Sequence, residues 1–218
     1  MSTVMKPGLI KRTCMRDRIR DVLVARILDG HYPAGTQLKE LSLAREFSVS
    51  QAPIREALRE LEGSGLVTSE RYRGTRVRGA DLREMRDSYE LRATMEARAV
   101  ELALPCSPAT LERLESHFAD MQRADAAGDN ERYIDAALAM HRCLMEASGN
   151  QVFVTVWDSL HFEVRGRLVL RLMAARGGGF QPLIDLHGRL IELLRAGDRA
   201  AAVATVRTLF ERVSAVFG

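Results

Sequence analysis

Long apolar runs are missing from this chain of 218 residues. No stretch approaches the roughly 20 consecutive apolar residues that a membrane-spanning helix needs. The segment 1–9 also lacks the apolar core that marks a secretion signal. We therefore expect a cytoplasmic protein that has no membrane partner.

Cysteines are few, and the motifs of several enzyme classes are missing. Cys14, Cys106 and Cys143 lie far apart, with no Cys-x-x-Cys pair, so we expect neither a disulfide framework nor a thiolate metal site. The chain has no P-loop, no Gly-x-Ser-x-Gly motif and no paired Glu-x-x-His motifs. A helical-bundle enzyme with an accessory basic domain therefore stays only a remote alternative.

Acidic residues are scarce in the first part of the chain. Residues 1–80 hold 15 Lys and Arg against 9 Asp and Glu, whereas residues 81–218 hold 17 against 20. The net charge of +3 is thus a basic front part followed by a mildly acidic body. This asymmetry favours a polyanionic partner for the front part alone.

Helical periodicity begins after a basic arm over residues 1–14. Met15, Ile19, Leu23 and Ile27 predict a helix that stops at Gly30. In a second short helix we expect three inward residues, namely Leu41, Ala44 and Phe47. A third helix follows Ser50, which is a natural N-cap, with Pro53 in its first turn. Its predicted buried stripe is Ile54, Leu58 and Leu61, and Gly63 and Gly65 end it.

Two short alternating segments, 66–72 and 75–78, flank a glycine-containing tip and predict a β-hairpin. Three helices and a hairpin make a winged helix-turn-helix, which we place at residues 15–79. The basic residues of the wing suit phosphates or the minor groove, and they are Arg71, Arg73, Arg76 and Arg78. In such a domain the third helix puts its N-terminal end into the DNA major groove.

Residues 30–79 resemble the GntR family of bacterial transcription regulators. The resemblance rests on Gly30, Gly35, Leu38-x-Glu40, Leu43-Ala44, Val49-Ser50, Pro53, Arg55-Glu56-Ala57-Leu58, Leu61, Gly65-Leu66-Val67 and Gly74. It implies DNA contacts from the third helix and the wing, and places Arg55 at the DNA. The residues that we expect at the DNA are Ser50, Gln51, Ala52, Arg55, Arg59, Arg73, Gly74, Thr75 and Arg76. Arg59 could equally be solvated, and Glu56 could serve only to hold Arg55 or Arg59.

The chain departs from the common pattern of that family at three positions. Ser48 stands where a glycine with a left-handed backbone is usual, which implies modest strain. Gln51-Ala52 replace a common Arg-Thr pair. Arg typically reads guanine, whereas Gln can pair with adenine and Ala can contact a thymine methyl group. We therefore expect an operator that differs from that of Arg-bearing relatives.

Residues 80–218 show no strand pattern. Prolines and glycines divide them into six helical segments, roughly 81–104, 108–127, 130–148, 150–176, 180–196 and 198–217. Residues 148–150 and 196–198 look like short corners between helices. The sequence thus predicts a mainly α protein, in which an all-α helical bundle follows the winged helix-turn-helix. Bundles of this kind hold ligands between facing helices.

Four polar residues interrupt the apolar faces of these segments. Arg92 and Glu96 fall on the inward stripe of the first, His141 on that of the third and His187 on that of the fifth. Arg92, His141 and His187 could line an effector pocket for a small anion. Each histidine could equally be satisfied inside the core, and Arg92 with Glu96 could be a structural ion pair.

This half resembles the FCD effector domain of FadR-type GntR proteins, and six helices match its VanR-type subgroup. The resemblance implies homodimers that sense small carboxylates or acyl compounds, often with a divalent metal. Two of the implied metal-ligand positions are Ala137 and Leu209, which cannot ligate. We therefore expect no cofactor and no tightly held metal. Retention of a divalent metal by His141 and His187 with a substitute, Asp135, His117 or His161, is the disfavoured alternative.

Together these features predict a homodimeric transcription regulator, more often a repressor in this family. Two-fold symmetry predicts a near-palindromic operator of double-stranded DNA. A small-molecule effector in the bundle would control operator affinity by binding two conformations differently. The alternative is a DNA-binding dimer whose bundle is purely structural and senses nothing.

Overall fold

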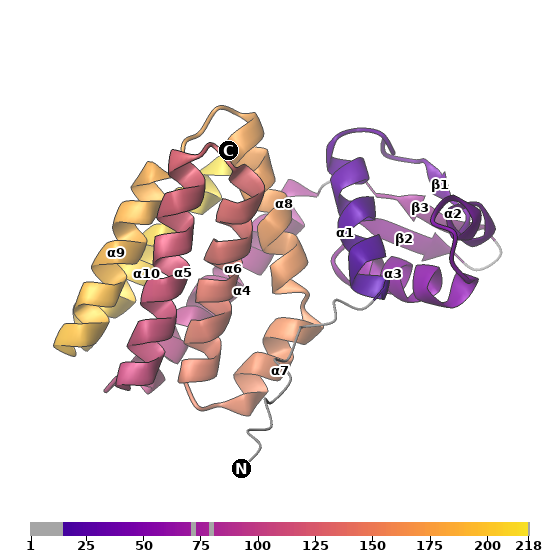
Figure 1. Ribbon diagram of the computed structural model, residues 1–218. Coiled ribbons are helices and arrows are strands. Elements are labelled where there is room, and N and C mark those ends of the chain that lie inside the picture. Colours follow the sequence, from indigo (N-terminus) through magenta and orange to yellow (C-terminus); the bar gives the residue numbers. More distant parts are fainter. Residues whose placement is uncertain (1–14, 71–72, 79–80, 218) are drawn as a thin grey trace, which may run out of the picture. The chain divides into compact units, whose positions relative to one another are not determined.

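The computed structural model describes residues 15–70, 73–78 and 81–217 (Figure 1). The basic arm predicted at 1–14 lies outside these residues, as does Arg71 of the predicted wing. The chain divides into two compact units near residue 79, and Gly63–Gly65 groups with the second unit. Within the described parts, no helix is both long and apolar enough to cross a membrane.

The first unit contains helices α1 (Met15–Leu28), α2 (Glu40–Glu46) and α3 (Gln51–Gly63) and a small antiparallel sheet. The sheet has strands β1 (Gln37–Leu38), β2 (Val67–Glu70) and β3 (Gly74–Val77) in the order β1-β3-β2. The predicted hairpin is confirmed, and Glu70 pairs with Gly74 next to its tip. Strand β1, which pairs Gln37 with Arg76, was not predicted.

The core of this unit follows the predicted apolar stripes of the first and third helices. Ile19 and Leu23 of α1 are buried. On α3, Ile54, Leu58 and Leu61 are buried together with Ala57, as expected for residues three and four apart on one helix face. This burial fixes one side of α3 and leaves its other side in solvent.

The prediction that Leu41 points inward was wrong. Its side chain is 50% exposed, whereas Leu43 and Ala44 are buried and Phe47 is half-buried. Leu43 and Phe47 are four apart and so share one face of α2. Because the inward face of this seven-residue helix is centred on that pair, Leu41 lies outside it.

The turn between α2 and α3 contains a residue in the left-handed region. Ser48 has φ = +54°, where the family resemblance leads one to expect glycine. The turn is closed by backbone hydrogen bonds from Ser48 N to Arg45 O (3.2 Å) and from Val49 N to Ala44 O (3.0 Å). The strain expected at Ser48 is thus located in the turn that sets the angle between α2 and α3.

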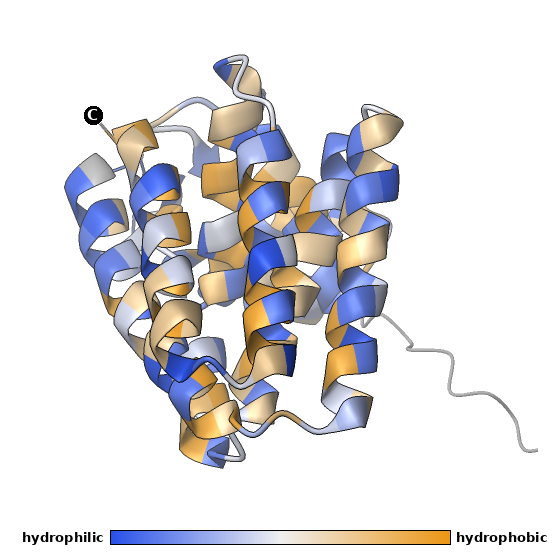
Figure 2. Cartoon of the chain, turned by 90° about the vertical axis from the view of Figure 1, so that its left-hand side faces the viewer, coloured by the Kyte–Doolittle hydropathy of each residue, from blue (hydrophilic) through white to orange (hydrophobic). Residues whose placement is uncertain are grey.

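The second unit is a helical bundle. Its α-helices are α4 (Leu82–Ala103), α5 (Pro108–Ala126), α6 (Asn130–Ala147), α7 (Gln151–Ser159), α8 (Phe162–Ala175), α9 (Gln181–Ala196) and α10 (Arg199–Ser214), followed by a 3₁₀ turn, η1 (Ala215–Phe217). Figure 2 shows hydrophobic residues along the helix faces that turn inward and hydrophilic residues along the outer faces. This amphipathic pattern is what buries a core in a bundle.

Side-chain caps set the starts of several of these helices. The side chains of Asp81, Ser107, Asp129, Asn150 and Asp198 accept hydrogen bonds from backbone N–H groups of the first turn of α4, α5, α6, α7 and α10. Gly197 ends α9 with φ = +74°. The corners predicted at 148–150 and 196–198 are therefore confirmed.

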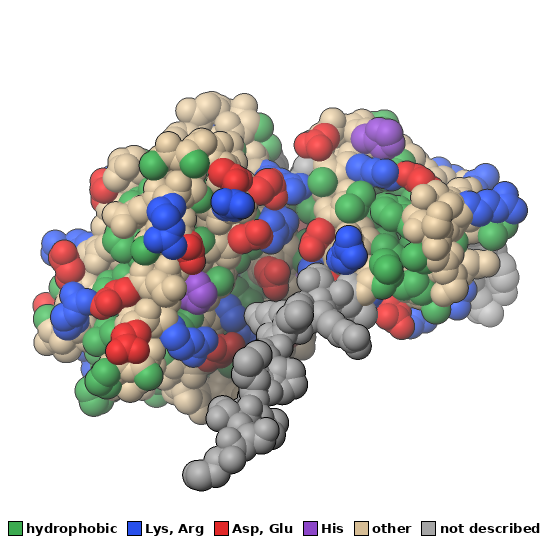
Figure 3. Space-filling model, viewed as in Figure 1, with side chains coloured by type: hydrophobic (Ala, Val, Ile, Leu, Met, Phe, Trp, Pro, Cys, Tyr) green, Lys and Arg blue, Asp and Glu red, His purple; other side chains and the backbone are tan. Residues whose placement is uncertain are grey.

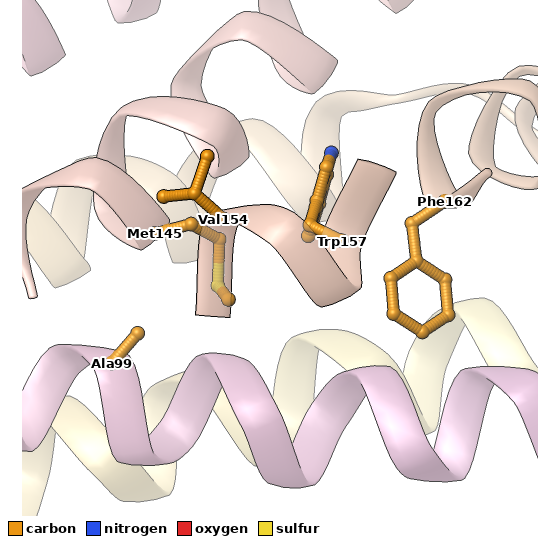
Figure 4. Packing of buried hydrophobic residues seen from close by; sticks show 5 residues of the cluster. All are labelled: Ala99, Met145, Val154, Trp157 and Phe162. Carbon is orange, nitrogen blue, oxygen red and sulfur yellow. The ribbon is translucent and has the colours of Figure 1, made fainter. Parts of the chain in front are cut away.

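The prediction of six helical segments was wrong at 150–176, which forms two helices. The break falls at His161, which has φ = +51°. Trp157 and Phe162 both enter one apolar cluster with Ala99, Met145 and Val154 (Figure 4). Five residues apart on a straight helix, they would point about 140° apart. The break brings both rings into one core. Because 150–176 forms two helices, the expected count of six helices, which matches the VanR-type subgroup, is not observed.

Candidate DNA-binding surface and effector pocket

The N-terminal part of α3 presents an exposed polar face. Ser50, Gln51, Ala52, Arg55 and Arg59 are all exposed, because the buried stripe of α3 occupies the opposite face. The short side chains of Ser50 and Ala52 leave the helix end open to approach by another surface. The arrangement is that of a helix whose first turns can enter a groove.

Arg55 is held by Glu40, the first residue of α2. Arg55 Nε lies 3.1 Å from both carboxylate oxygens of Glu40, and Arg55 Nη2 donates to Glu40 Oε2 at 2.8 Å. The hydrogen bonds from Arg55 hold the pKa of the Glu40 carboxyl below its usual value. The sequence suggests Glu56 as a partner of Arg55 and does not identify Glu40. The signal that could have identified Glu40 is its place in the Leu-x-Glu segment of the family resemblance.

The wing carries exposed basic side chains on and beside β3. Arg73, Gly74 and Arg76 are exposed and Thr75 is half-buried. Arg73 Nη1 lies 3.1 Å from Glu70 Oε2, and Arg76 Nη1 donates to the carbonyl oxygen of Gly35 at 3.1 Å. In Figure 3, Lys and Arg side chains gather at the edge of this unit over the region of the sheet and α2. The surface can therefore offer several cations to a polyanion.

In the second unit, the four predicted polar residues meet in the core. Arg92 and Glu96 lie on α4, His141 on α6 and His187 on α9, and their exposed fractions are 2%, 0%, 6% and 1%. The expectation that they interrupt inward faces is confirmed. Because buried polar groups are costly without partners, each must be hydrogen-bonded.

These side chains form one chain of hydrogen bonds. Arg92 Nε donates to Glu96 Oε1 at 2.7 Å, and His141 Nδ1 lies 2.5 Å from Glu96 Oε2. Burial alone would raise the pKa of Glu96, but the charges of His141 and Arg92 outweigh it and hold that pKa below its usual value. An ionised carboxylate only accepts hydrogen bonds, so His141 Nδ1 carries a proton.

His187 completes this chain as a neutral imidazole. His187 Nδ1 donates to the carbonyl oxygen of Leu183 at 2.6 Å, and its Nε2 lies 3.3 Å from Nε2 of His141. Burial, and then the nearby charge of His141, lower the pKa of His187 to about 3. Because the neutral His187 donates from Nδ1, its Nε2 is the acceptor in the contact with His141.

Arg92 sits among three aromatic rings. Its guanidinium carbon lies 4.6 Å from the ring centre of Trp157, 5.1 Å from that of Phe210 and 5.5 Å from that of Tyr89. These distances allow cation–π attraction in a desolvated site. Gly166 makes room for it, because a Cβ there would lie 2.8 Å from Arg92 Nη1. A permanent cation is thus built into the bundle core.

A small cavity of about 20 Å³ lies beside this cluster. Its lining includes Arg92, His141 and His187 and also Ala137 and Leu209. That volume holds about one water molecule. The two positions that the family resemblance assigns to further metal ligands therefore face the same space as the histidines, and neither side chain has a donor atom.

The residues present do not fit a tightly held metal in this cavity. Zn²⁺ takes three or four protein ligands, and this site offers two imidazoles next to the cation of Arg92. Asp135 is 62% exposed and pairs with Arg167 on another face. His117 lines a separate groove, and His161 lies at the break between α7 and α8. Over residues 15–70, 73–78 and 81–217, no three His, Cys, Asp or Glu side chains group as a metal site.

Each of the two units matches the model of a known protein family. Residues 15–77 match the model of the bacterial regulatory proteins of the gntR family, and residues 87–212 match the FCD domain. This chain belongs to the GntR family. It is a DNA-binding transcriptional regulator with an FCD domain, and not an enzyme.

Several relatives that match most of this chain are named as repressors. GlaR of Escherichia coli, an HTH-type transcriptional repressor, is 33% identical, over 83% of this chain and 86% of that protein. A probable D-xylose utilization operon transcriptional repressor of Paenarthrobacter nicotinovorans is 29% identical, over 87% and 82%. The gluconate operon transcriptional repressor of Bacillus subtilis is 24% identical, over 90% and 82%.

Solved structures show the same fold. Escherichia coli McbR/YncC superposes with a TM-score of 0.75 at 20% identity, over 93% of this chain and 96% of that one. A putative GntR regulator from Rhodococcus sp. RHA1 superposes with a TM-score of 0.73 at 23% identity, also over 93% and 96%. The order of the DNA-binding unit and the bundle is thus that of known GntR regulators.

Proposed function

We propose that this regulator is a homodimeric repressor that binds a near-palindromic operator and leaves it when a small carboxylate or acyl compound enters the bundle. Each protomer would place the start of α3 in a major groove and the wing on the adjacent backbone. The observation that carries the DNA part is the exposed face of Gln51, Ala52 and Arg55 opposite the buried stripe of α3. Membership of the GntR family and the names of its relatives support the sign of regulation.

An anionic effector suits the chemistry of the buried cluster. Arg92, His141 and His187 line the cavity, and a guanidinium with imidazole N–H groups can donate hydrogen bonds to an anion. Because the cavity holds only about one water molecule, such a ligand requires the helices around it to open. A ligand that binds only the open arrangement has different affinity for two states, which is the condition for control.

The small closed cavity also favours a second candidate, in which the bundle senses nothing. In that case the Arg92–Glu96–His141–His187 chain is a structural network, and only dimerisation is left to the bundle. The two candidates predict different results for a ligand that stabilises the bundle. If the bundle controls DNA binding, this ligand should also release the protein from DNA; if the bundle senses nothing, DNA binding should not change.

Replacing Arg55 with Ala tests the DNA assignment. Loss of a charged contact at the groove is expected to weaken binding to a duplex selected from a random library by about 10- to 100-fold, because one bidentate contact gives about 1–3 kcal/mol of discrimination. Fluorescence anisotropy measures the affinity, and circular dichroism confirms that the variant folds. Binding within twofold of the wild type would contradict the placement of α3 in the groove.

A further inference from the structure

The contact between Glu40 and Arg55 uses one edge of the guanidinium and leaves another open. Arginine has five N–H groups in one plane. Glu40 receives hydrogen bonds from Nε and Nη2 of Arg55. Three N–H groups take no part in this contact, and two of them, one on Nη1 and one on Nη2, run parallel at the end of the side chain.

That second edge has the spacing of a bidentate donor. Two parallel N–H groups match two phosphate oxygens or the O6 and N7 atoms of guanine. The side chain of Arg55 is 52% exposed, so this end of it lies in solvent. The pair therefore presents Arg55 with its donors already directed.

Both partners stand on well-anchored helices. Ile54 and Leu58 are buried on either side of Arg55 along α3, and Leu43 and Ala44 are buried on α2. The turn through Ser48 joins the two helices. A long flexible side chain is thus held in one conformation before DNA arrives, which reduces the entropy lost on binding.

Glu40 also changes the charge of this surface. Its carboxylate lies beside Arg55, and Arg59 is a further positive charge near it. Glu40 therefore weakens the attraction of this face for phosphates in general, whatever their sequence. Glu40 thus directs the side chain of Arg55 and lowers the net positive charge of the surface. Both effects favour sequence-selective binding over general binding to DNA.

From this geometry we propose that Glu40 is a positioning residue for DNA recognition, which holds Arg55 side-on so that only its end-on edge meets the DNA. The proposal rests on the proposed function, since it requires Arg55 to lie at the groove. It makes specificity, the ratio of affinities for a preferred and a scrambled site, depend on a residue of α2 that itself need not touch DNA.

The test compares Glu40→Gln with wild type on two probes. One is a duplex selected from a random library by the wild-type protein, and the other is a scrambled duplex of the same composition. We expect the ratio of affinities to fall about five- to tenfold, because the bidentate contact of Arg55 loosens. Binding to the scrambled duplex should be unchanged or tighter, since a negative charge is removed.

Glu56→Gln is the matched control, because it removes the same charge from an exposed position next to Arg55 on α3. It should leave the affinity ratio unchanged. An equal fall in both variants would overturn the proposal, as would an unchanged ratio for Glu40→Gln. If Arg55→Ala abolishes selective binding and Glu40→Gln does not, only this inference fails. If Arg55→Ala binds normally, the proposed function itself fails.

Discussion

His187 is buried as a neutral imidazole, and this makes the fold sensitive to acid. Its pKa is about 3 in the folded chain, against an ordinary value of 6.5. Below pH 6.5 the unfolded chain therefore takes up a proton that the folded chain does not. The stability that His187 contributes is present above pH 6.5 and is lost as the pH falls toward 3, by at most about 1.4 kcal/mol per pH unit.

The variant His187→Asn removes this titration and keeps a donor for the carbonyl of Leu183. We expect its free energy of unfolding to fall less steeply between pH 6.5 and pH 5 than that of the wild type. Urea unfolding at several pH values gives both slopes. His31→Asn, at an exposed position, is the control and should retain the wild-type slope. Equal slopes for His187→Asn and wild type would show that His187 is not held neutral.

At the scale of single residues, the sequence predicts the buried polar cluster of the bundle but not the exposed ion pair of Glu40 and Arg55. Arg92, Glu96, His141 and His187 each interrupt an apolar stripe, so periodicity alone marks them as inward. Their joining into one hydrogen-bonded chain depends on how α4, α6 and α9 face each other, which periodicity does not contain. Glu40 and Arg55 are 15 positions apart and both exposed, so no pattern links them before the crossing of α2 and α3 is known.

The turn between α2 and α3 is an element whose strain can be measured. Ser48 holds φ = +54°, a region that costs a residue with a Cβ about 1 kcal/mol. Ser48→Gly should therefore raise the unfolding temperature of the DNA-binding unit slightly, although glycine also gains entropy in the unfolded chain.

Ser42→Gly is the matched comparison, since Ser42 is exposed inside α2. There glycine has no strain to relieve and should cost roughly 0.5–1 kcal/mol. Differential scanning calorimetry of both variants shows whether each substitution raises or lowers the unfolding temperature. Destabilisation of similar size in both would show that the turn is not strained at Ser48.

Elements marked by glycine, proline or capping side chains were predictable, and those without such signals were not. The corners at 148–150 and 196–198 contain Gly149 and Gly197. The break between α7 and α8 has neither glycine nor proline, and it arises because Trp157 and Phe162 share one core. Strand β1 is two residues long, too short for an alternating pattern, and exists only because β3 offers it an edge.

At the scale of the whole molecule, a ligand in the bundle should act on DNA binding. A thermal-shift screen of small carboxylates, acyl-CoA compounds and divalent metals is expected to find an anion that raises the unfolding temperature. The same compound should weaken binding to the selected duplex. Metals should give little shift, because Ala137 and Leu209 supply no ligand atom to the cavity.

Two results would contradict these expectations. An anion that stabilises the protein and leaves DNA affinity unchanged would favour the purely structural bundle. A metal bound at one ion per chain, seen by elemental analysis, would show that substitute ligands complete the site. Arg92→Lys tests whether the anion binds at this residue, since the variant keeps the positive charge and loses the planar guanidinium group that binds an anion through two hydrogen bonds.

The aromatic surroundings of Arg92 also give the molecule a built-in optical reporter. Trp157 is the single tryptophan of the chain, is 2% exposed and stacks against the guanidinium of Arg92. Its emission wavelength and intensity depend on the polarity and charge around the indole ring. Any motion that opens the bundle or displaces Arg92 would therefore change the fluorescence of unlabelled protein, and the signal would come from the FCD domain alone.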